Sequence, residues 1–429
     1  MSEAFELSIA RMGAGGDGVG ALPDGTPCFV PRSLPGERVR TAPGTRRRDG
    51  THANLIEVLA PSPDRVEPPC PHFDQGCGGC AVQHWAPAAQ AAWKRDRLRE
   101  ALSRAGYPDA VVAETVTTPP GRRRRADFAL RRSPGQVLVG FHESGSGAVL
   151  DLAQCPVLDP RLVALIDPLR DLLCRLPALR KEGSAVVNLL DTGPDLLLRT
   201  DGALSPPERV VLAAFARRAG IPRIAWARKD SPVEIAVQLG PATITLSGVE
   251  VAPAPGAFLQ ASPDGEAAII AAVLAGLPAR LAGRGRIADL HAGLGTLSIP
   301  LAAQGRVTAF EGEAAAVAAL ATAAARAGVK VTATRRDLVR QPLTVAELGA
   351  FAAVVLDPPH AGAAEQVPLI ARSTVPAVVY VSCNPAALSR DARALAQAGW
   401  TLEAATPIDQ FVHSAQLEAV IAFRRGGKR

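Results

Sequence analysis

One cysteine stands where an apolar strand is expected to end at a ligand crevice. The run 375–381 is followed by Ser382-Cys383-Asn384-Pro385, and the Asn-Pro pair stops the strand directly after the thiol. Because the carboxyl ends of parallel strands face the crevice of an α/β sheet, the Cys383 thiol would lie at its rim. A lone cysteine is usually a small buried hydrophobic residue, but this position favours a covalent nucleophile.

Two carboxylates are expected near the same rim. Asp357 follows an apolar run and precedes Pro358-Pro359, and this rigid pair would fix the carboxylate at the strand end. Glu418 opens the last apolar run, 418–423. An isolated glutamate at a strand start is more often exposed, but beside Cys383 it could serve as a general base.

A glycine loop after an earlier strand indicates a nucleotide-like cofactor. Residues 289–296 read Asp-Leu-His-Ala-Gly-Leu-Gly-Thr, and the glycines permit a tight turn and close approach to a ligand. A lone Gly-x-Gly is weak evidence, but the next strand ends in Glu311, which can accept both hydroxyls of a ribose. Asp337, after the third strand, is positioned for an adenine edge. A dinucleotide site shares this logic, whereas Asp-x-x-x-Gly-x-Gly favours S-adenosylmethionine.

Length, charge and cysteine usage set the class of protein. A chain of 429 residues predicts roughly two to four domains. No uncharged apolar stretch reaches bilayer-spanning length, and residues 1–11 lack a signal-peptide core, so we expect a cytoplasmic protein without a membrane segment. In that reducing compartment the seven cysteines are expected to ligate metal or act in catalysis rather than form disulfides. A net charge of +6 favours a polyanionic partner.

Arginines gather at 46–48 and 122–125, with two more at 131–132. Such runs are more often solvated faces than binding sites. Both clusters are therefore candidates for nucleic-acid contacts, and no more.

Three segments of different pattern must position these residues. Short apolar runs in residues 1–62 predict a small OB-like β-barrel. Residues 63–250 predict a helix at 88–105 and then a mixed α+β domain. Residues 251–429 predict a C-terminal α/β Rossmann-like domain with a doubly wound parallel sheet, because strands alternate with helices there. Its candidate strands are 286–290, 306–310, 330–334, 352–356, 375–381 and 418–423.

The chain resembles the RNA uracil-C5 methyltransferases over nearly its whole length, and the shared motifs occur in the order that the family has. The shared motifs are Ser-Cys-Asn-Pro at 382–385, Asp-Pro-Pro at 357–359, the 289–296 loop, Phe-Leu-Gln at 258–260 and Asp-Gln-Phe-x-His-x4-Glu at 409–418. This resemblance implies Cys383 as nucleophile, Glu418 as proton acceptor and S-adenosylmethionine as methyl donor. The implied cofactor contacts are Gln260, His291, Thr296, Glu311, Asp337 and Asp357.

The chemistry of that family explains why a thiol is needed. Uracil carbon 5 is a poor nucleophile towards a sulfonium methyl group, so a nucleophile must first add at carbon 6. A base must then remove the carbon-5 proton before the thiol can leave. Because a free thiol is only about 3% thiolate at neutral pH, the pocket should supply positive charge or hydrogen bonds.

The N-terminal half resembles the ribosomal-RNA branch of the same family. Residues 30–37, Val-Pro-Arg-Ser-Leu-Pro-Gly-Glu, resemble a TRAM domain, an RNA-binding module. Four cysteines resemble the ligands of a 4Fe-4S cluster, although four thiolates could equally hold zinc by spacing alone. They are Cys70, Cys77, Cys80 and Cys155. The implied partner is RNA, with 23S ribosomal RNA ahead of transfer RNA, and the implied state is a monomer. Cys28 and Cys174 are expected in the core.

The chain departs from the family pattern at three positions. His291 stands where an aromatic residue is usual, Ala292 where a cysteine is usual, and His360 where an arginine usually follows Asp-Pro-Pro. A lost guanidinium near the target base could alter substrate orientation or the activation of Cys383.

Two other functions remain open from the sequence. An amino-group methyltransferase of the Asp-Pro-Pro-aromatic type would leave Cys383 idle and would lack its aromatic residue at 360. A non-catalytic RNA-binding protein on a methyltransferase scaffold would have no need of intact Cys383, Glu418 and cofactor carboxylates.

Overall fold

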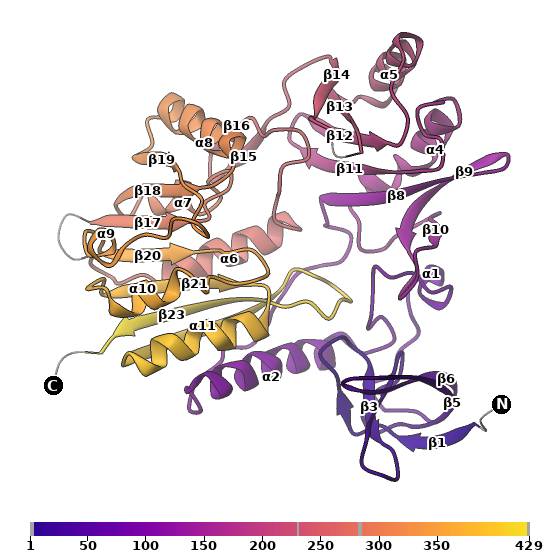
Figure 1. Cartoon of the computed structure of the whole chain (residues 1–429), viewed down its shortest axis with the longest axis horizontal. Coiled ribbons are helices and arrows are strands. Elements are labelled where there is room, and N and C mark those ends of the chain that lie inside the picture. Colours follow the sequence, from indigo (N-terminus) through magenta and orange to yellow (C-terminus); the bar gives the residue numbers. More distant parts are fainter. Residues whose placement is uncertain (1–3, 230, 282–284, 427–429) are drawn as a thin grey trace.

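The computed structural model describes residues 4–229, 231–281 and 285–426, and the outermost ends of the predicted first and third domains, 1–3 and 427–429, lie outside this range. Three large sheets follow one another along the chain (Figure 1). Among the described residues, no helix is long and apolar enough to cross a membrane.

The first sheet is six-stranded, with the order β1-β5-β6-β4-β3-β2. Its strands are β1 (Phe5–Ser8), β2 (Arg11–Met12), β3 (Gly18–Ala21), β4 (Pro27–Val30), β5 (Arg38–Arg47) and β6 (Gly50–Ala60). Alternate residues such as Leu7, Val30 and Val39 are buried in a small core of their own. The predicted β structure of the N-terminal segment is therefore present.

The second sheet is seven-stranded, with the order β10-β9-β8-β11-β12-β13-β14. Its strands are β8 (Arg125–Ser133), β9 (Gln136–His142), β10 (Val149–Asp151), β11 (Glu182–Leu190), β12 (Gly193–Thr200), β13 (Arg223–Arg228) and β14 (Glu234–Gln238). The helices of this region are α1 (Pro71–Asp74), α3 (Pro160–Val163), α4 (Ile166–Cys174) and α5 (Pro206–Ala219). Helices α4 and α5 pack against the sheet around a core that includes Phe128, Leu172 and Phe215.

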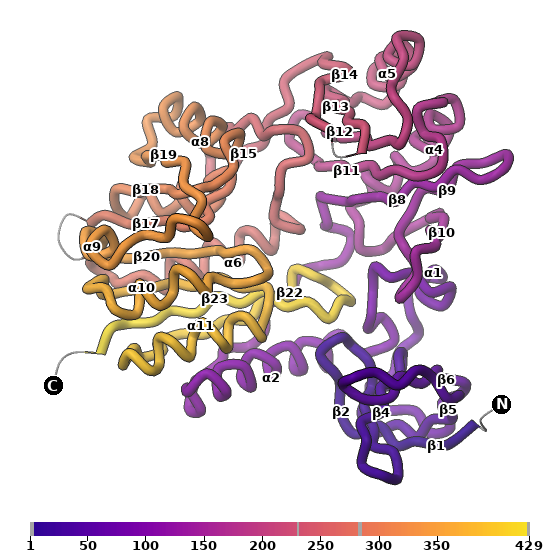
Figure 2. Tube along the Cα trace, viewed as in Figure 1, coloured from indigo at the N-terminus to yellow at the C-terminus, as the bar shows by residue number. Residues whose placement is uncertain are grey.

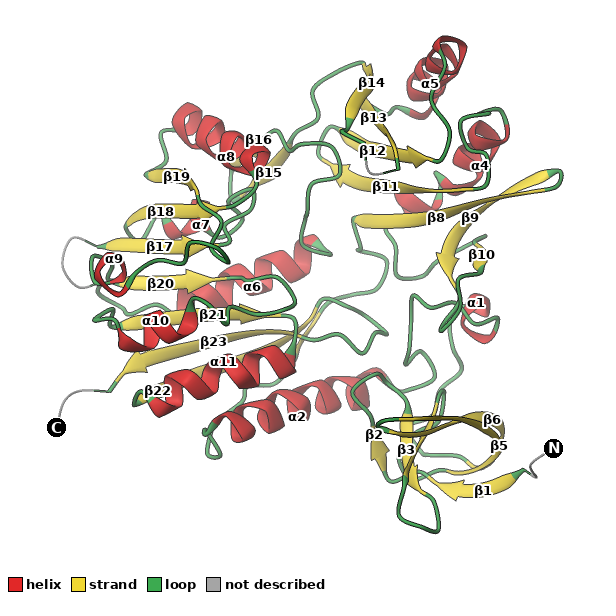
Figure 3. Cartoon of the chain, viewed as in Figure 1, coloured by secondary structure: helices red, strands yellow, loops and turns green. Residues whose placement is uncertain are grey.

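The third sheet is eight-stranded, with the order β19-β18-β17-β20-β21-β23-β22-β7 (Figure 3). Its strands are β7 (Val116–Thr117), β17 (Arg286–Leu290), β18 (Arg306–Glu311), β19 (Val331–Arg335), β20 (Ala353–Leu356), β21 (Ala377–Ser382), β22 (Trp400–Asp409) and β23 (Glu418–Arg425). The six predicted strands are all present. A hairpin of β15 (Ile244–Leu246) and β16 (Val249–Val251) precedes this sheet.

The sheet, predicted to be parallel, is mixed. Strands β17 to β21 are parallel, but β23 is antiparallel to both β21 and β22. Strand β22 escaped prediction because its sequence, Trp-Thr-Leu-Glu-Ala-Ala-Thr-Pro-Ile-Asp, has no sustained apolar run and contains a proline.

Helices cover both faces of this third sheet because its strand residues alternate in direction. Val378 and Tyr380 face one core, which includes residues of α2 (Pro87–Ala105) and α11 (Pro385–Gln397). Val379 and Val381 face the other core, against α6 (Pro263–Ala275). The remaining helices are α7 (Ser298–Leu301), α8 (Ala314–Ala327), α9 (Val345–Leu348) and α10 (Val367–Arg372).

A segment from the predicted central domain, residues 87–117, packs against this C-terminal sheet. Helix α2 lies alongside α11 (Figure 2), and β7 pairs with β22 and so forms the edge of the sheet. The buried Lys94 of α2 donates to Asp409 at the end of β22, at 2.5 Å, and to the carbonyl of Phe411. Residues 87–117 thus brace the segment that leads to Glu418.

Candidate active site

Strand pairing brings the predicted nucleophile and base together. Ser382 at the end of β21 pairs with Ala419 at the start of β23. Because these strands are antiparallel, the next residue on each, Cys383 and Glu418, lies at the same edge of the sheet. Cys383 is half-buried and Glu418 is 4% exposed, so the pair sits at the boundary between core and solvent.

The loop that carries Cys383 is held by its neighbour Asn384. Asn384 caps helix α11, and its side-chain oxygen accepts from the amides of Ala386 and Ala387. Its Nδ2 donates to the carbonyl of His360 at 2.9 Å. The same contact brings the His360 ring to the thiol, with 3.7 Å between Nδ1 and Sγ. The Asp-Pro-Pro-His and Ser-Cys-Asn-Pro segments are therefore one structural unit.

The environment of the thiol disfavours its thiolate form. Burial, and then the charges of Glu418 and Asp357, raise the pKa of Cys383 to about 11. The N-terminus of α11, directly after the thiol, acts in the opposite direction through its partial positive charge. A nucleophilic role at neutral pH therefore requires additional help from a base or a cation.

Two amide side chains connect Glu418 to Asp357. Gln410 donates to Glu418 Oε2 and to Gln260 Oε1, both at 2.9 Å, and its own Oε1 accepts from the Ala261 amide at 3.1 Å. Gln260 in turn lies 3.4 Å from Asp357 through its Nε2 and the carboxylate Oδ2. Gln410 was not among the predicted site residues, although it lies within the quoted motif 409–418.

The two carboxylates of this network are poised near neutral pH. Burial, and then the charge of Asp357, raise the pKa of Glu418 to about 8, while the bond from Gln410 lowers it. Burial raises the pKa of Asp357 to about 7, against the bond from Gln260. Within the described part of the chain, Glu418 Oε1 is buried without a hydrogen-bond partner. That oxygen is free to accept a proton from a bound substrate.

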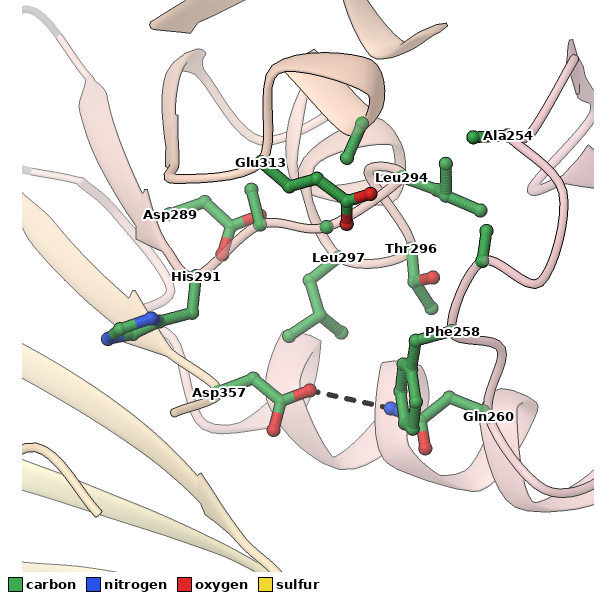
Figure 4. Close-up of a pocket in the computed structure, with 14 residues that line it drawn as sticks. Ala254, Phe258, Gln260, Asp289, His291, Leu294, Thr296, Leu297, Glu313 and Asp357 are labelled. Carbon is green, nitrogen blue, oxygen red and sulfur yellow. Dashed lines mark hydrogen bonds between the residues drawn. The ribbon is translucent and has the colours of Figure 1, made fainter. Parts of the chain in front are cut away.

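A pocket opens beside this network at the carboxyl edge of the sheet (Figure 4). Four of the six predicted cofactor residues line it: Gln260, His291, Thr296 and Asp357. Figure 4 shows Gln260 and Asp357 bonded on one side of the pocket, with Thr296 near Phe258. The His291 ring points away from these three residues. The pocket has a volume of about 70 Å³. Small-molecule sites have roughly 300 Å³ or more, so a nucleoside would extend beyond this pocket.

The glycine loop shapes one wall of this pocket. Gly295 has φ +92°, and a Cβ there would lie 2.4 Å from the Leu320 side chain, so any other residue would strain the backbone and displace that side chain. Asp289 beneath the loop is fully buried, and burial raises its pKa to about 7. Ser298 donates to Asp289 Oδ2 at 2.5 Å. Asp289 therefore supports the loop from below as well as lining the pocket.

The other two predicted cofactor residues lie next to the pocket rather than in its lining. Glu311 accepts from the amides of Gly293 and Glu313, at 2.9 and 2.8 Å. Asp337 is exposed and accepts from the amides of Val339 and Arg340. In this structure both carboxylates order their own loops, and Glu313 lines the pocket instead of Glu311.

The four predicted metal-binding cysteines surround a second cavity, of about 460 Å³. They are Cys70, Cys77, Cys80 and Cys155, all free thiols. Residues 411, 412, 414 and 416, which connect β22 to β23, line the same cavity. In the part of the chain that the structure describes, no three His, Cys, Asp or Glu side chains form a group that could hold a metal ion.

The two remaining cysteines differ from each other. Cys28 is fully buried, as expected. Cys174 is exposed, so its assignment to the core was wrong. It is the last residue of α4, and the buried residues of that helix, such as Leu169, Leu172 and Leu173, lie on the other face.

The arginine clusters also differ. Arg124 is 6% exposed and pairs with Glu266 at 2.5 Å, and Arg123 lines the cysteine cavity. This cluster is largely structural, and Arg122 at its exposed end pairs with Asp264. The cluster at 46–48 is fully exposed on the β5–β6 hairpin. Only the latter has the accessibility expected of nucleic-acid contacts.

Comparisons with known proteins show the family of the chain. Residues 283–425 match the family described as tRNA (Uracil-5-)-methyltransferase. The chain is 40% identical to an uncharacterized RNA methyltransferase of Brucella suis, over 99% of both chains. It is 35% identical to the 23S rRNA (uracil(1939)-C(5))-methyltransferase RlmD of Chromohalobacter salexigens, over 99% of this chain and 90% of that protein.

One solved structure shares the fold across almost the whole chain. It is the Pyrococcus abyssi tRNA (uracil-54, C5)-methyltransferase in complex with S-adenosyl-L-homocysteine, with a TM-score of 0.75 at 21% identity, covering 97% of this chain and 99% of that one. The multi-domain architecture and its C-terminal Rossmann-like domain are thus shared. Together with the full-length similarities, this places the chain in the family of RNA uracil-C5 methyltransferases, which use S-adenosylmethionine as methyl donor.

Proposed function

We propose that this enzyme methylates carbon 5 of a uridine in 23S ribosomal RNA through a covalent bond between Cys383 and carbon 6. The observation that carries the proposal is the position of the Cys383 thiol, beside a buried carboxylate with one free oxygen and near Asp357, which lines the pocket. Full-length similarity to two RlmD proteins supports ribosomal RNA as the substrate. The alternative substrate is transfer RNA, which the matched family and the P. abyssi structure name.

In the first step Cys383 Sγ adds to carbon 6 of the uracil. The electrons of the C5=C6 double bond move toward the carbonyl at carbon 4, which gives carbon 5 enolate character. Carbon 5 then takes the methyl group from S-adenosylmethionine, and the electron pair of the broken bond remains on the donor sulfur. Because a base within folded RNA is not accessible, the uridine must first be flipped out of its stack.

In the second step Glu418 removes the proton from carbon 5. Its Oε1 is the acceptor, because Oε2 is already bonded to Gln410. The electrons of the C–H bond restore the C5=C6 double bond, and the bond from carbon 6 to Cys383 Sγ breaks. An amino-group methyltransferase would use neither side chain, and a non-catalytic scaffold would have no reason to keep Glu418 near its thiol.

The methyl donor is proposed to occupy the pocket at the glycine loop. Gln260, His291, Thr296 and Asp357 line this pocket, and the carboxylate of Asp357 would offset the positive charge of the donor sulfonium. Glu311 and Asp337 lie beside it, where a ribose and an adenine that extend past the small enclosed volume could reach them.

The cysteine cavity is proposed to hold a 4Fe-4S cluster. Its four thiols border a space of about 460 Å³, and burial together with the other three cysteines raises the pKa of Cys80 to about 12. These thiols would ionise only with a cation among them. Zinc, which four sulfurs would hold at about 2.3 Å, is the alternative occupant, and the described cysteines are not arranged around either group in this structure. A cluster, when bound, would cross-link the segment 70–80 around α1 to Cys155, which follows β10, and it would lie next to the 411–416 segment that also lines the cavity.

We further propose the division into a TRAM-like barrel at 1–62, a central cluster domain at 63–250 and a methyltransferase domain at 251–429. The six-stranded N-terminal sheet with its own core supports the first unit. Its exposed arginines at 46–48 fit an RNA-binding role for a monomer acting in the cytoplasm.

The substrate is tested by mapping 5-methyluridine in ribosomal and transfer RNA from cells with and without the gene. We expect loss at one 23S position, restored by the wild-type gene but not by Cys383→Ala. Loss confined to transfer RNA would replace the proposed substrate, and restoration by Cys383→Ala would overturn the proposed mechanism.

A further inference from the structure

His360 is placed to act directly on the Cys383 thiol. It follows Asp357-Pro-Pro at the end of β20, and its Nδ1 lies 3.7 Å from Sγ, within the range of a hydrogen bond to sulfur. The His360 backbone is held by the side chain of Asn384, the residue next to the thiol. Both partners of the sulfur–imidazole contact are thus fixed to the same short segment.

The thiol needs such a partner. The charged groups that act on Cys383 are the carboxylates of Glu418 and Asp357, and both oppose ionisation, as does burial. The N-terminus of α11 alone contributes a fraction of a positive charge. A nucleophile in this environment reacts slowly unless a neighbouring base accepts its proton during the attack.

We propose that His360 is the general base that takes the proton of Cys383 as Sγ adds to carbon 6. This inference rests on the proposed role of Cys383 as nucleophile. The S–H bond breaks, its proton moves to His360 Nδ1, and the sulfur electron pair forms the bond to carbon 6. The imidazole must begin as the tautomer protonated on Nε2. When the sulfur later leaves carbon 6, it keeps the bonding electron pair and takes the proton back from His360.

Glu418 is not suited to take this first proton. The same carboxylate must later accept the proton from carbon 5, and one carboxylate cannot hold both protons during a turnover. His360 is exposed, so it can also exchange its proton with water. Two separate acceptors give each proton its own path.

Other charged groups face this loop from α11. Arg390 donates to the carbonyl of Ala361 and pairs with Asp391, and Asp391 accepts from the amide of Ala363. These groups are unchanged in the variants below. They therefore affect the position of every pH profile equally and cannot produce a difference between variants.

The test follows alkylation of Cys383 by iodoacetamide as a function of pH, with the Cys383 peptide quantified by mass spectrometry in the full-length protein. The wild type should be alkylated at an appreciable rate at neutral pH, because His360 can accept the thiol proton during the attack. His360→Ala should react only where the thiol itself ionises, and its rate at pH 7 should fall by about tenfold or more, since each unit of thiol pKa changes the thiolate fraction tenfold. His360→Arg should show one limb, at lower pH than in His360→Ala, because a fixed cation stabilises the thiolate without accepting a proton.

His142→Ala is the matched control, because His142 is an exposed histidine far along the chain from Cys383. Identical pH profiles for the wild type and His360→Ala would overturn the role of His360. A covalent complex between the wild type and RNA carrying 5-fluorouridine is measured in parallel. If that complex forms but the alkylation profiles coincide, only the inference about His360 fails. If the complex does not form, the proposed mechanism itself fails.

Discussion

Replacing Gln410 with alanine should shift the pH dependence of the proton-removal step. Gln410 is 4% exposed and donates to Glu418 Oε2 at 2.9 Å, a bond that favours the carboxylate form and lowers the pKa of Glu418. Glu418 accepts a proton only as a carboxylate, so its activity is present above its pKa and lost below it. Removing the bond raises the pKa, and the acidic limb of the profile should move to higher pH.

The size of this shift follows from the kind of bond. A hydrogen bond to a charged group contributes about 1.5–3 kcal/mol, and one pH unit corresponds to about 1.36 kcal/mol. The limb should therefore move upward by about one to two pH units, starting from the pKa of about 8 in the free enzyme. The variant also leaves the Ala261 amide and Gln260 Oε1 without this partner, so a stability loss of about 1–3 kcal/mol per buried group is expected as well.

The assay is a single-turnover experiment that follows decay of the covalent RNA–enzyme complex between pH 6 and pH 10. Gln397→Ala, at the exposed end of α11, is the matched control and should leave the profile unchanged. Gln410→Ala protein must be shown by circular dichroism to be folded at the assay temperature. A folded variant whose decay profile coincides with that of the wild type would refute the role assigned to Gln410.

Three further predictions concern the methyl donor, the cysteines and the RNA surface. Burial raises the pKa of Asp289 and Asp357 to about 7 and that of Glu418 to about 8, so these groups lose their stabilising contribution as the pH rises from about 4 to 8. The sulfonium of S-adenosylmethionine offsets the charge of these carboxylates. The melting temperature with S-adenosylmethionine should therefore exceed that with S-adenosylhomocysteine, by a margin that grows from pH 6 to pH 8. A constant margin would contradict this prediction. Protein purified without oxygen should contain about four irons and four sulfides. Cys80→Ser should lose the iron and sulfide together with thermal stability, whereas the control Cys174→Ser should keep them. One zinc and no iron would reverse the cluster assignment. Replacing Arg46, Arg47 and Arg48 with alanine should reduce the slope of log affinity against log salt by about 0.7 for each phosphate of a single strand that these arginines neutralise, and an unchanged slope would mean that the hairpin does not bind RNA.

The strands of the catalytic sheet could be predicted because each carries a short apolar run that ends in a chemically distinctive residue. Asp289, Glu311, Asp357 and Cys383 all mark strand ends in the structure, within one or two residues. The pairing of β21 with β23 could not be predicted in the same way, because β22 between them in sequence has no apolar run. That pairing is what puts Cys383 next to Glu418.

Contacts between distant segments were also beyond the sequence. Nothing in the helix at 87–105 indicates that it packs on α11, or that Lys94 pairs with a carboxylate 315 positions away. Gln410 was overlooked because an amide carries no chemical signature until its partners are known. The burial of single residues was also hard to predict, because it depends on the face of the element on which a residue lies. Cys174, expected in the core, is exposed, whereas Arg124, in a candidate RNA-binding cluster, is buried.

The measurement that tests the mechanism most directly is a denaturing gel of enzyme incubated with S-adenosylmethionine and RNA carrying 5-fluorouridine at the target position. Fluorine cannot leave as a cation, so the wild type should remain covalently attached to the methylated RNA. Glu418→Gln should give the same band with ordinary RNA, because addition and methylation proceed but the carbon-5 proton stays. Cys383→Ala should give no band with either RNA, while still binding S-adenosylmethionine. Absence of a covalent band from the wild type, or normal turnover by Cys383→Ala, would contradict the account.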